Sequence, residues 1–225
     1  MKKKLRLINP HIFLSESIAI IGNSSCILNK KSGKVIDGYD DVVRFNRAKL
    51  KNYEDYVGTK TTLRVINNGT FERNKIKPGL GWEESDQDYD FLLKQKNMKI
   101  LTISPSKISD EKKNKNIKKE NQYYFLENRY LQFLICLNFI KNIDIFNELI
   151  KILLRKKNFS VGFYSILLCI ASGIKPHLYG FDLSEDMTKR SHYWEKAGNV
   201  GNFHNLSSEH KIINKFLKLK YVYLY

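Results

Sequence analysis

The chain has 225 residues, 42% of them hydrophobic and 12% aromatic, which is typical of a folded domain and excludes an intrinsically disordered chain. Its 39 lysines and arginines outnumber its 23 aspartates and glutamates, and the formal net charge of +16 favours an anionic partner: a nucleotide, a nucleic acid, an anionic glycan or an acidic membrane surface. The length fits one domain, 1–225. The basic segment 1–6 precedes no apolar stretch long enough for a signal peptide or a membrane span, so we expect a cytoplasmic or membrane-peripheral protein.

The first part of the chain predicts short strands separated by turns. The short run 17–21, apolar after Ser17, ends at Gly22-Asn23-Ser24-Ser25, which predicts a buried parallel strand followed by a helix that Ser24 or Ser25 caps. The polar segments 75–90 and 110–121 are expected to be loops. The first could cover a site, and the second carries five lysines that either face solvent or form a basic contact strip. Further strands are expected at 41–46, 61–66 and 98–104.

The second part of the chain predicts longer helices and two more strands. Apolar residues at three- and four-residue spacing predict a helix over 123–157. Strands that alternate with helices predict an α/β fold with a mainly parallel sheet. The remaining elements are expected as a helix at 163–172, a strand at 177–181, a helix at 207–217 and a strand at 221–225.

Two groups of residues contain side chains that bind metals, and neither has the context that a metal site needs. The cysteines Cys26, Cys136 and Cys169 are odd in number and lack metal-ligand spacing, so we expect buried free thiols. Asp88-Tyr89-Asp90 resembles the Asp-x-Asp metal motif of many nucleotide-sugar enzymes, but it precedes an apparent helix instead of following a strand. The sequence therefore predicts no metal site.

Small and amide-bearing residues stand where the predicted strands end and a helix begins. Backbone amides at a helix N-terminus attract anions, so Gly22-Asn23-Ser24-Ser25 fits a phosphate or nucleotide turn, although a plain helix cap would look the same. Asn46 ends the next strand and would face the same crevice, or would be an ordinary turn residue. Ser160-Val161-Gly162 lets a ligand approach the backbone at the start of another helix, and a simple N-cap explains it equally well.

Two histidines follow the strand expected at 177–181. His192 and His204 could stabilise a leaving phosphate and act as a general base, since the ordinary histidine pKa of about 6.5 suits proton transfer near neutral pH. On their own they would more often be surface residues. Their combination with Tyr193-Trp194-Glu195 and Glu209 favours a catalytic site.

Taken together, these segments resemble the animal-type sialyltransferase family, which has large, small, third and very small sialyl motifs. The match follows the order of the family's motifs along the chain. The large motif is similar to 18–24 through 36–37, 41–48 and 57–62, and the small motif to 160–162 through 177–181. The third motif is similar to 192–195, and the very small motif to His204 with Glu209.

The resemblance implies a single-domain, Rossmann-like variant of the GT-A glycosyltransferase fold. It also implies inverting, metal-independent transfer from CMP-sialic acid, with no cofactor besides this donor. By the same resemblance, His204 would be the general base and His192 would contact the phosphate. The cytidine nucleotide would be held by Asn23, Ser24 and Asn46 and lined by the backbone of Ser160, Gly162 and Gly180. Supporting roles would fall to Glu209 and Tyr193.

The chain departs from the animal enzymes in ways that suit a bacterial cytoplasm. Ile18 and Gly173 occupy the positions of the family's disulfide, and we expect no membrane anchor or stem. With a Lys, Asn and Ile bias, these features predict a bacterial enzyme that builds a surface glycan, lipooligosaccharide or capsule, on a glycan or glycolipid acceptor. The lysines would give peripheral contact with anionic lipid at the inner membrane.

Three alternatives remain open from the sequence. CMP-Kdo, or another CMP-activated keto-sugar acid, could replace CMP-sialic acid as donor. The net charge of +16 also fits a nucleic-acid-binding basic module. However, the aromatic residues fall in apolar helices and strands and do not alternate with arginine, so we expect no nucleic-acid partner. An inactive binding relative is disfavoured because both motif histidines are present.

Overall fold

The structure is a computed structural model that describes residues 2–4, 13–46, 48–67, 98–104, 122–127, 139, 141–154, 159–184, 192–194 and 206–225. Its centre is a seven-stranded sheet in the order β7-β6-β5-β4-β3-β8-β9, in which every pair of neighbours is parallel. A separate antiparallel pair joins β1 (Lys2–Lys4) to β2 (Phe13–Ser15). The strands of the large sheet are β3 (Ile18–Ile21), β4 (Asp41–Phe45), β5 (Leu63–Asn67), β6 (Lys99–Ser104), β7 (Gln122–Glu127), β8 (His177–Tyr179) and β9 (Tyr223–Leu224).

The strand order reverses between β3 and β8. From β3 the chain adds β4, β5, β6 and β7 outward on one side, and it then returns to add β8 and β9 on the other side. In open parallel sheets the ligand crevice forms at the carboxyl ends of the strands where the order reverses. The fold therefore points to the turns that follow β3, β4 and β8.

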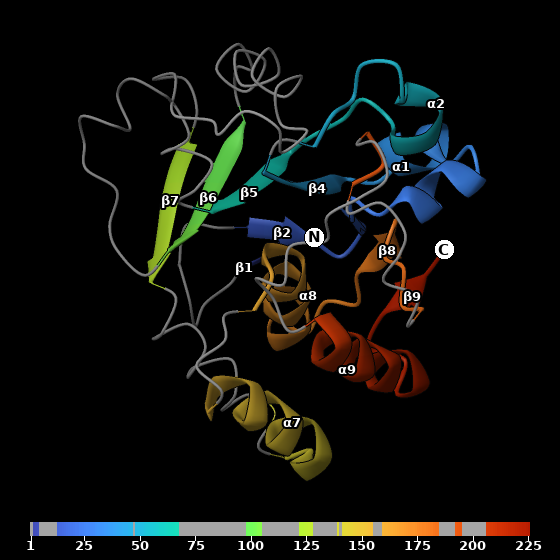
Figure 1. Ribbon diagram of the computed structural model, residues 1–225. Coiled ribbons are helices and arrows are strands. Elements are labelled where there is room, and N and C mark those ends of the chain that lie inside the picture. Colours follow the sequence, from blue (N-terminus) through green and yellow to red (C-terminus); the bar gives the residue numbers. More distant parts are fainter. Residues whose placement is uncertain are drawn as a thin grey trace, which may run out of the picture.

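Helices cover both faces of this sheet (Figure 1). On one face, α7 (Ile143–Leu154), α8 (Val161–Ala171) and α9 (Leu206–Lys218) share a core with Ile18 and Ile20 of β3. On the other, the 3₁₀ helix η1 (Ser25–Asn29), α1 (Gly33–Asp37) and α2 (Glu54–Val57) enclose Ala19 and Ile21. Because β3 is buried on both faces, its sequence is a continuous apolar run without alternation.

The predicted α/β fold with a parallel sheet is confirmed, and most predicted elements are present within a few residues. The helix expected over 123–157 is wrong at its start, where Gln122–Glu127 form β7 and pair with β6. α7 covers Ile143–Leu154 of the expected helix, and residues 128–138, 140 and 155–158 lie outside the described residues. Residues 122–127 are rich in aromatics, which favour strands, and a short apolar run cannot be assigned to helix or strand by periodicity alone.

The cysteine prediction is correct for one residue and wrong for another. Cys169 is buried in α8, and burial raises the pKa of its thiol, whereas Cys26 in η1 is only half-buried. Cys136 lies outside the described residues, as do the predicted loops 75–90 and 110–121. Within the described part of the chain, no helix is long and apolar enough to cross a membrane.

Candidate active site

The turns after β3 and β8 pack directly against each other. The Gly22 amide donates to the carbonyl of Tyr179 at 2.7 Å, and the Ser24 amide donates to the carbonyl of Gly180 at 3.1 Å. A Cβ on Gly22 would lie 2.3 Å from the Gly180 oxygen, and Gly180 has a φ of +68°, so both positions require glycine. The Ser24 hydroxyl accepts from the Cys26 amide and caps η1, as the sequence predicted for this position.

Asn46 ends β4 in a left-handed conformation with φ of 43°. Asparagine tolerates this region better than most residues. Its amide donates to the carbonyl of Val65 at 2.9 Å, and its carbonyl accepts from Nη1 of Arg64, also at 2.9 Å. β4 pairs with β3, so Asn46 and Asn23 follow neighbouring strands at the same edge of the sheet.

The first turn of α8 reaches the same edge. Ser160 caps the helix, because its hydroxyl accepts from the Phe163 amide at 3.2 Å. A Cβ on Gly162 would meet Phe181 at 3.3 Å and Phe45 at 3.5 Å, so the helix lies against the residues that flank Gly180 and Asn46. A larger side chain at position 162 would push against these two rings.

Glu209, in the first turn of α9, joins that helix to the start of α8. Its Oε1 accepts from the Ser160 amide at 2.7 Å and its Oε2 from the Ser160 hydroxyl at 2.6 Å. The residue is only 2% exposed. Burial raises the pKa of Glu209 to about 7, although the hydrogen bonds from Ser160 act in the opposite direction.

Residues 192–194 lie beside the turn after β3. The Tyr193 amide donates to the Asn23 carbonyl at 2.8 Å, and the Tyr193 hydroxyl donates to the carbonyl of Lys49. The buried Tyr193 ring contacts the rings of Tyr53 and Trp194 edge-on, and the half-buried His192 stacks on Trp194 with ring centroids 4.7 Å apart. Tyr193 therefore ties this segment to the predicted nucleotide turn.

The structure brings together all the predicted site residues that it describes. Asn23, Ser24, Asn46 and Gly180 follow adjacent strands, Ser160 and Gly162 approach from α8, and His192, Tyr193 and Glu209 border them. His204 lies outside the described residues, two positions before Leu206, where α9 begins. Asp88 and Asp90 also lie outside, and the described residues contain no group of three or more acidic, histidine or cysteine side chains that could hold a metal.

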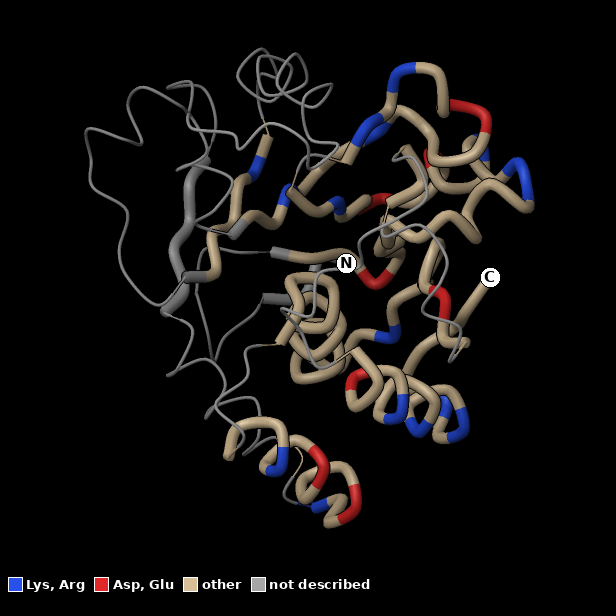
Figure 2. Tube along the Cα trace, in the orientation of Figure 1, with Lys and Arg blue, Asp and Glu red and all other residues tan. Residues whose placement is uncertain are grey.

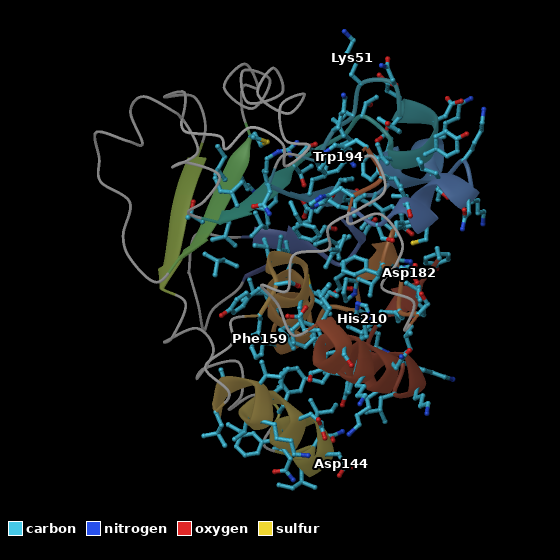
Figure 3. All side chains as sticks on the ribbon, viewed as in Figure 1. Lys51, Asp144, Phe159, Asp182, Trp194 and His210 are labelled. Atoms are coloured by element: carbon cyan, nitrogen blue, oxygen red, sulfur yellow. The ribbon has the colours of Figure 1, made fainter. Side chains whose placement is uncertain are left out.

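Three further residues at or near this edge were not predicted from the sequence. Arg44 and Arg64 are buried in β4 and β5, and the only sequence signal was a cation inside each apolar strand. His210 follows Glu209 in α9 and is half-buried, which lowers its pKa, while the charge of Asp182 after β8 raises it. Figure 3 shows Asp182 and His210 on these neighbouring segments.

Comparison with known proteins agrees with this architecture. The human β-galactoside α-2,6-sialyltransferase 2 is 26% identical over 213 residues, which cover 88% of this chain and 38% of the relative. The chain thus spans about two fifths of the length of that curated relative.

Two solved structures share the fold. A mammalian sialyltransferase in complex with Gal-β-1-3GalNAc-ortho-nitrophenol superposes with a TM-score of 0.60 at 15% identity, over 98% of this chain and 76% of that one. CstII from Campylobacter jejuni in complex with cytidine-5'-monophosphate gives a TM-score of 0.50 at 16% identity, over 92% and 78% of the two chains. Residues 15–221 match glycosyltransferase family 29 (sialyltransferase), and the chain belongs to this family.

Proposed function

We propose that the chain transfers sialic acid from CMP-sialic acid to a sugar hydroxyl, with inversion and without a metal. The observation that carries the proposal is the meeting of Asn23, Asn46 and the N-terminus of α8 at the point where the strand order reverses. The Oδ1 atom of Asn23 is buried and accepts no hydrogen bond from the described residues. Such an atom costs about 1–3 kcal/mol, which donation from a bound nucleotide would offset.

The proposed chemistry is a single displacement at the anomeric carbon of the sialic acid. The acceptor hydroxyl oxygen forms the new bond to that carbon while the bond to the phosphate oxygen breaks, and CMP leaves with the electron pair. His204 takes the hydroxyl proton, and His192 stabilises the negative charge that develops on the phosphate. Glu209 and Tyr193 act through the backbone of Ser160 and Asn23, which they hold in place.

The acceptor we propose is a bacterial surface glycan, lipooligosaccharide or capsule, extended in the cytoplasm. Its support is the Lys, Asn and Ile bias and the isoleucine and glycine at the family's disulfide positions, Ile18 and Gly173. The test is a transfer assay that offers CMP-sialic acid and CMP-Kdo, the alternative donor, with several lipooligosaccharide acceptors. Transfer from CMP-Kdo alone would show that CMP-Kdo, and not CMP-sialic acid, is the donor. Transfer from neither compound would refute the proposal.

If these residues bind the donor, Asn23→Ala and Asn46→Ala should each weaken CMP binding about tenfold, since each substitution removes one polar contact to the nucleotide. Isothermal titration calorimetry with CMP, and with AMP and short DNA as other anions, measures the effect. Asn29→Ala is the matched control, because this asparagine is exposed at the end of η1, away from the strand ends. If either variant binds CMP with the affinity of the parent, the substituted residue is not part of the donor site.

The absence of a required metal predicts that turnover survives EDTA. The double variant Asp88→Ala with Asp90→Ala should likewise keep turnover within about twofold of the parent, because no step of the proposed displacement uses a metal. Activity is measured before and after chelation and after adding back magnesium or manganese. A loss on chelation that either metal restores would contradict this part of the proposal.

We also propose peripheral contact with anionic lipid through the C-terminal basic surface, defined as Lys218, Leu219, Lys220, Tyr223 and Tyr225. All five side chains are exposed. Figure 2 shows several basic segments along α9 and a single acidic one near its start. Between residues 206 and 225 the only acidic residue is the buried Glu209. Lysines beside exposed tyrosine and leucine are typical of segments that rest on a charged membrane surface.

This contact predicts that the protein sediments with phosphatidylglycerol vesicles and not with phosphatidylcholine vesicles. Lys218→Glu with Lys220→Glu should reduce the bound fraction by about tenfold or more, because each lysine near an anionic surface contributes roughly 1 kcal/mol. Lys30→Glu with Lys34→Glu is the matched control, since both lysines are exposed on the η1–α1 side. Equal losses in the two double variants would show that net charge alone drives binding and would refute the assigned surface.

A further inference from the structure

Two arginines lie side by side inside the sheet. Arg44 of β4 and Arg64 of β5 are register partners, so their side chains project from the same face. They are 0% and 1% exposed. Burial lowers the pKa of Arg44 to about 10 and that of Arg64 to about 9, and the charge of Arg44 lowers the pKa of Arg64 further.

The hydrogen bonds of Arg64 do not offset the free-energy cost of burying its charge. Its Nη1 donates to the Asn46 carbonyl at 2.9 Å, but its Nε and Nη2 have no partner in the described part of the chain. Among the described residues the Asp37 carboxylate attracts the Arg44 guanidinium, whereas no carboxylate pairs with the guanidinium of Arg64. Replacing such a buried cation by an apolar side chain of similar volume is often neutral for stability or increases it. The stability of the fold therefore does not explain an arginine at position 64.

What Arg64 does contact is the backbone of the predicted donor residue. Asn46 has a φ of 43° and is held by β5 from both sides: its amide donates to Val65, and its carbonyl accepts from Arg64. These two bonds fix the peptide planes on either side of the Asn46 Cα. They therefore set the direction in which the Asn46 side chain leaves the end of β4.

We propose that Arg64 is a positioning residue that holds Asn46 in the conformation needed to bind the CMP part of the donor. This inference rests on the proposed function for the role of CMP. Arg64 does not touch the donor and acts through the Asn46 carbonyl. Arg44 differs, because it donates to the carbonyls of Val57 and Lys60 and to the Thr61 hydroxyl, and so supports the segment before β5.

The test compares Arg64→Met with Arg64→Lys, each alone and combined with Asn46→Ala. We expect Arg64→Met to weaken CMP binding about tenfold in calorimetry with no drop in the midpoint of urea denaturation. Arg64→Lys keeps one cationic donor and should restore affinity to within about threefold of the parent. In the Asn46→Ala background, Arg64→Met should change CMP affinity less than about twofold, because its effect passes through the missing side chain. Thr102→Val is the control, since Thr102 is buried on the same sheet face without a hydrogen-bond partner for its hydroxyl among the described residues.

A second readout does not depend on CMP. Arg64→Met should speed hydrogen exchange at the Asn46 amide selectively, leaving the central strand amides of Ala19 and Ile20 at their parental rates. Equal loss of CMP affinity in the parent and Asn46→Ala backgrounds would overturn the proposal, as would unchanged exchange at Asn46. If the parent itself fails to bind CMP, the proposed donor is wrong, and the exchange result alone decides whether Arg64 positions Asn46.

Discussion

Glu209→Ala is expected to lower the free energy of unfolding by roughly 2–4 kcal/mol and to reduce turnover by more than about a hundredfold. The substitution removes both acceptors of Ser160, whose amide and hydroxyl donate to the carboxylate at 2.7 and 2.6 Å. It also leaves a cavity at a side chain that is 2% exposed. The start of α9 would then separate from the start of α8. The donor-binding residues at the start of α8 would no longer be held at a fixed distance from the proposed base, which precedes α9. Urea denaturation and a transfer assay measure the two effects.

Glu209→Gln is the matched control, since it keeps the shape and one acceptor but cannot ionise. The pKa of Glu209 is raised from 4.5 to about 7, so the folded state holds this proton more tightly than the unfolded state does. Its contribution to stability is therefore complete below about pH 4.5, falls as the pH rises to about 7, and is constant above that. The free energy of unfolding of the parent minus that of Glu209→Gln should fall by roughly 3 kcal/mol across this window, at about 1.36 kcal/mol per pKa unit. A difference that does not change with pH would show that the carboxyl titrates normally.

The centre of the fold could be predicted because its signals are local. The run at Ile18–Ile21 is apolar throughout, which is what a strand buried on both faces requires, and Gly22 follows it directly. The strand at Gln122–Glu127 could not be separated from the helical pattern that follows it, because its assignment depends on pairing with β6. Tertiary pairing decides such short apolar runs, and periodicity alone does not.

The same division holds for the candidate site. Asn23, Asn46 and Ser160 could be selected because each stands at the end of a strand or the start of a helix, and motif order along the chain marked His192 and Glu209. The bond between Glu209 and Ser160 joins residues 49 positions apart, and no spacing rule predicts it. The buried pair of Arg44 and Arg64 was missed for a related reason. The register that places them side by side is a property of the sheet and of neither strand.

His204→Ala is expected to lower kcat by about 10²–10⁴-fold while CMP binding stays within about twofold of the parent. A general base acts on the acceptor hydroxyl, so its loss appears in the chemical step and not in the donor complex. His192→Ala should differ by weakening CMP binding as well, because a residue that contacts the phosphate affects both donor affinity and rate. Single-turnover kinetics and calorimetry on the same preparations separate the two effects.

The control for both histidines is His177→Gln, at the amino end of β8, where the ring stacks on Tyr223 and lies at the sheet edge opposite the candidate site. This variant should turn over at the parental rate. In the parent, the acid limb of the kcat/KM profile should report one ionisation near the ordinary histidine range, about 6 to 7, because only the neutral imidazole of His204 can accept the proton. That limb should disappear from the residual activity of His204→Ala. Near-parental turnover of a well-folded His204→Ala preparation, with a verified acceptor, would show that another group removes the proton and that His204 is a surface residue.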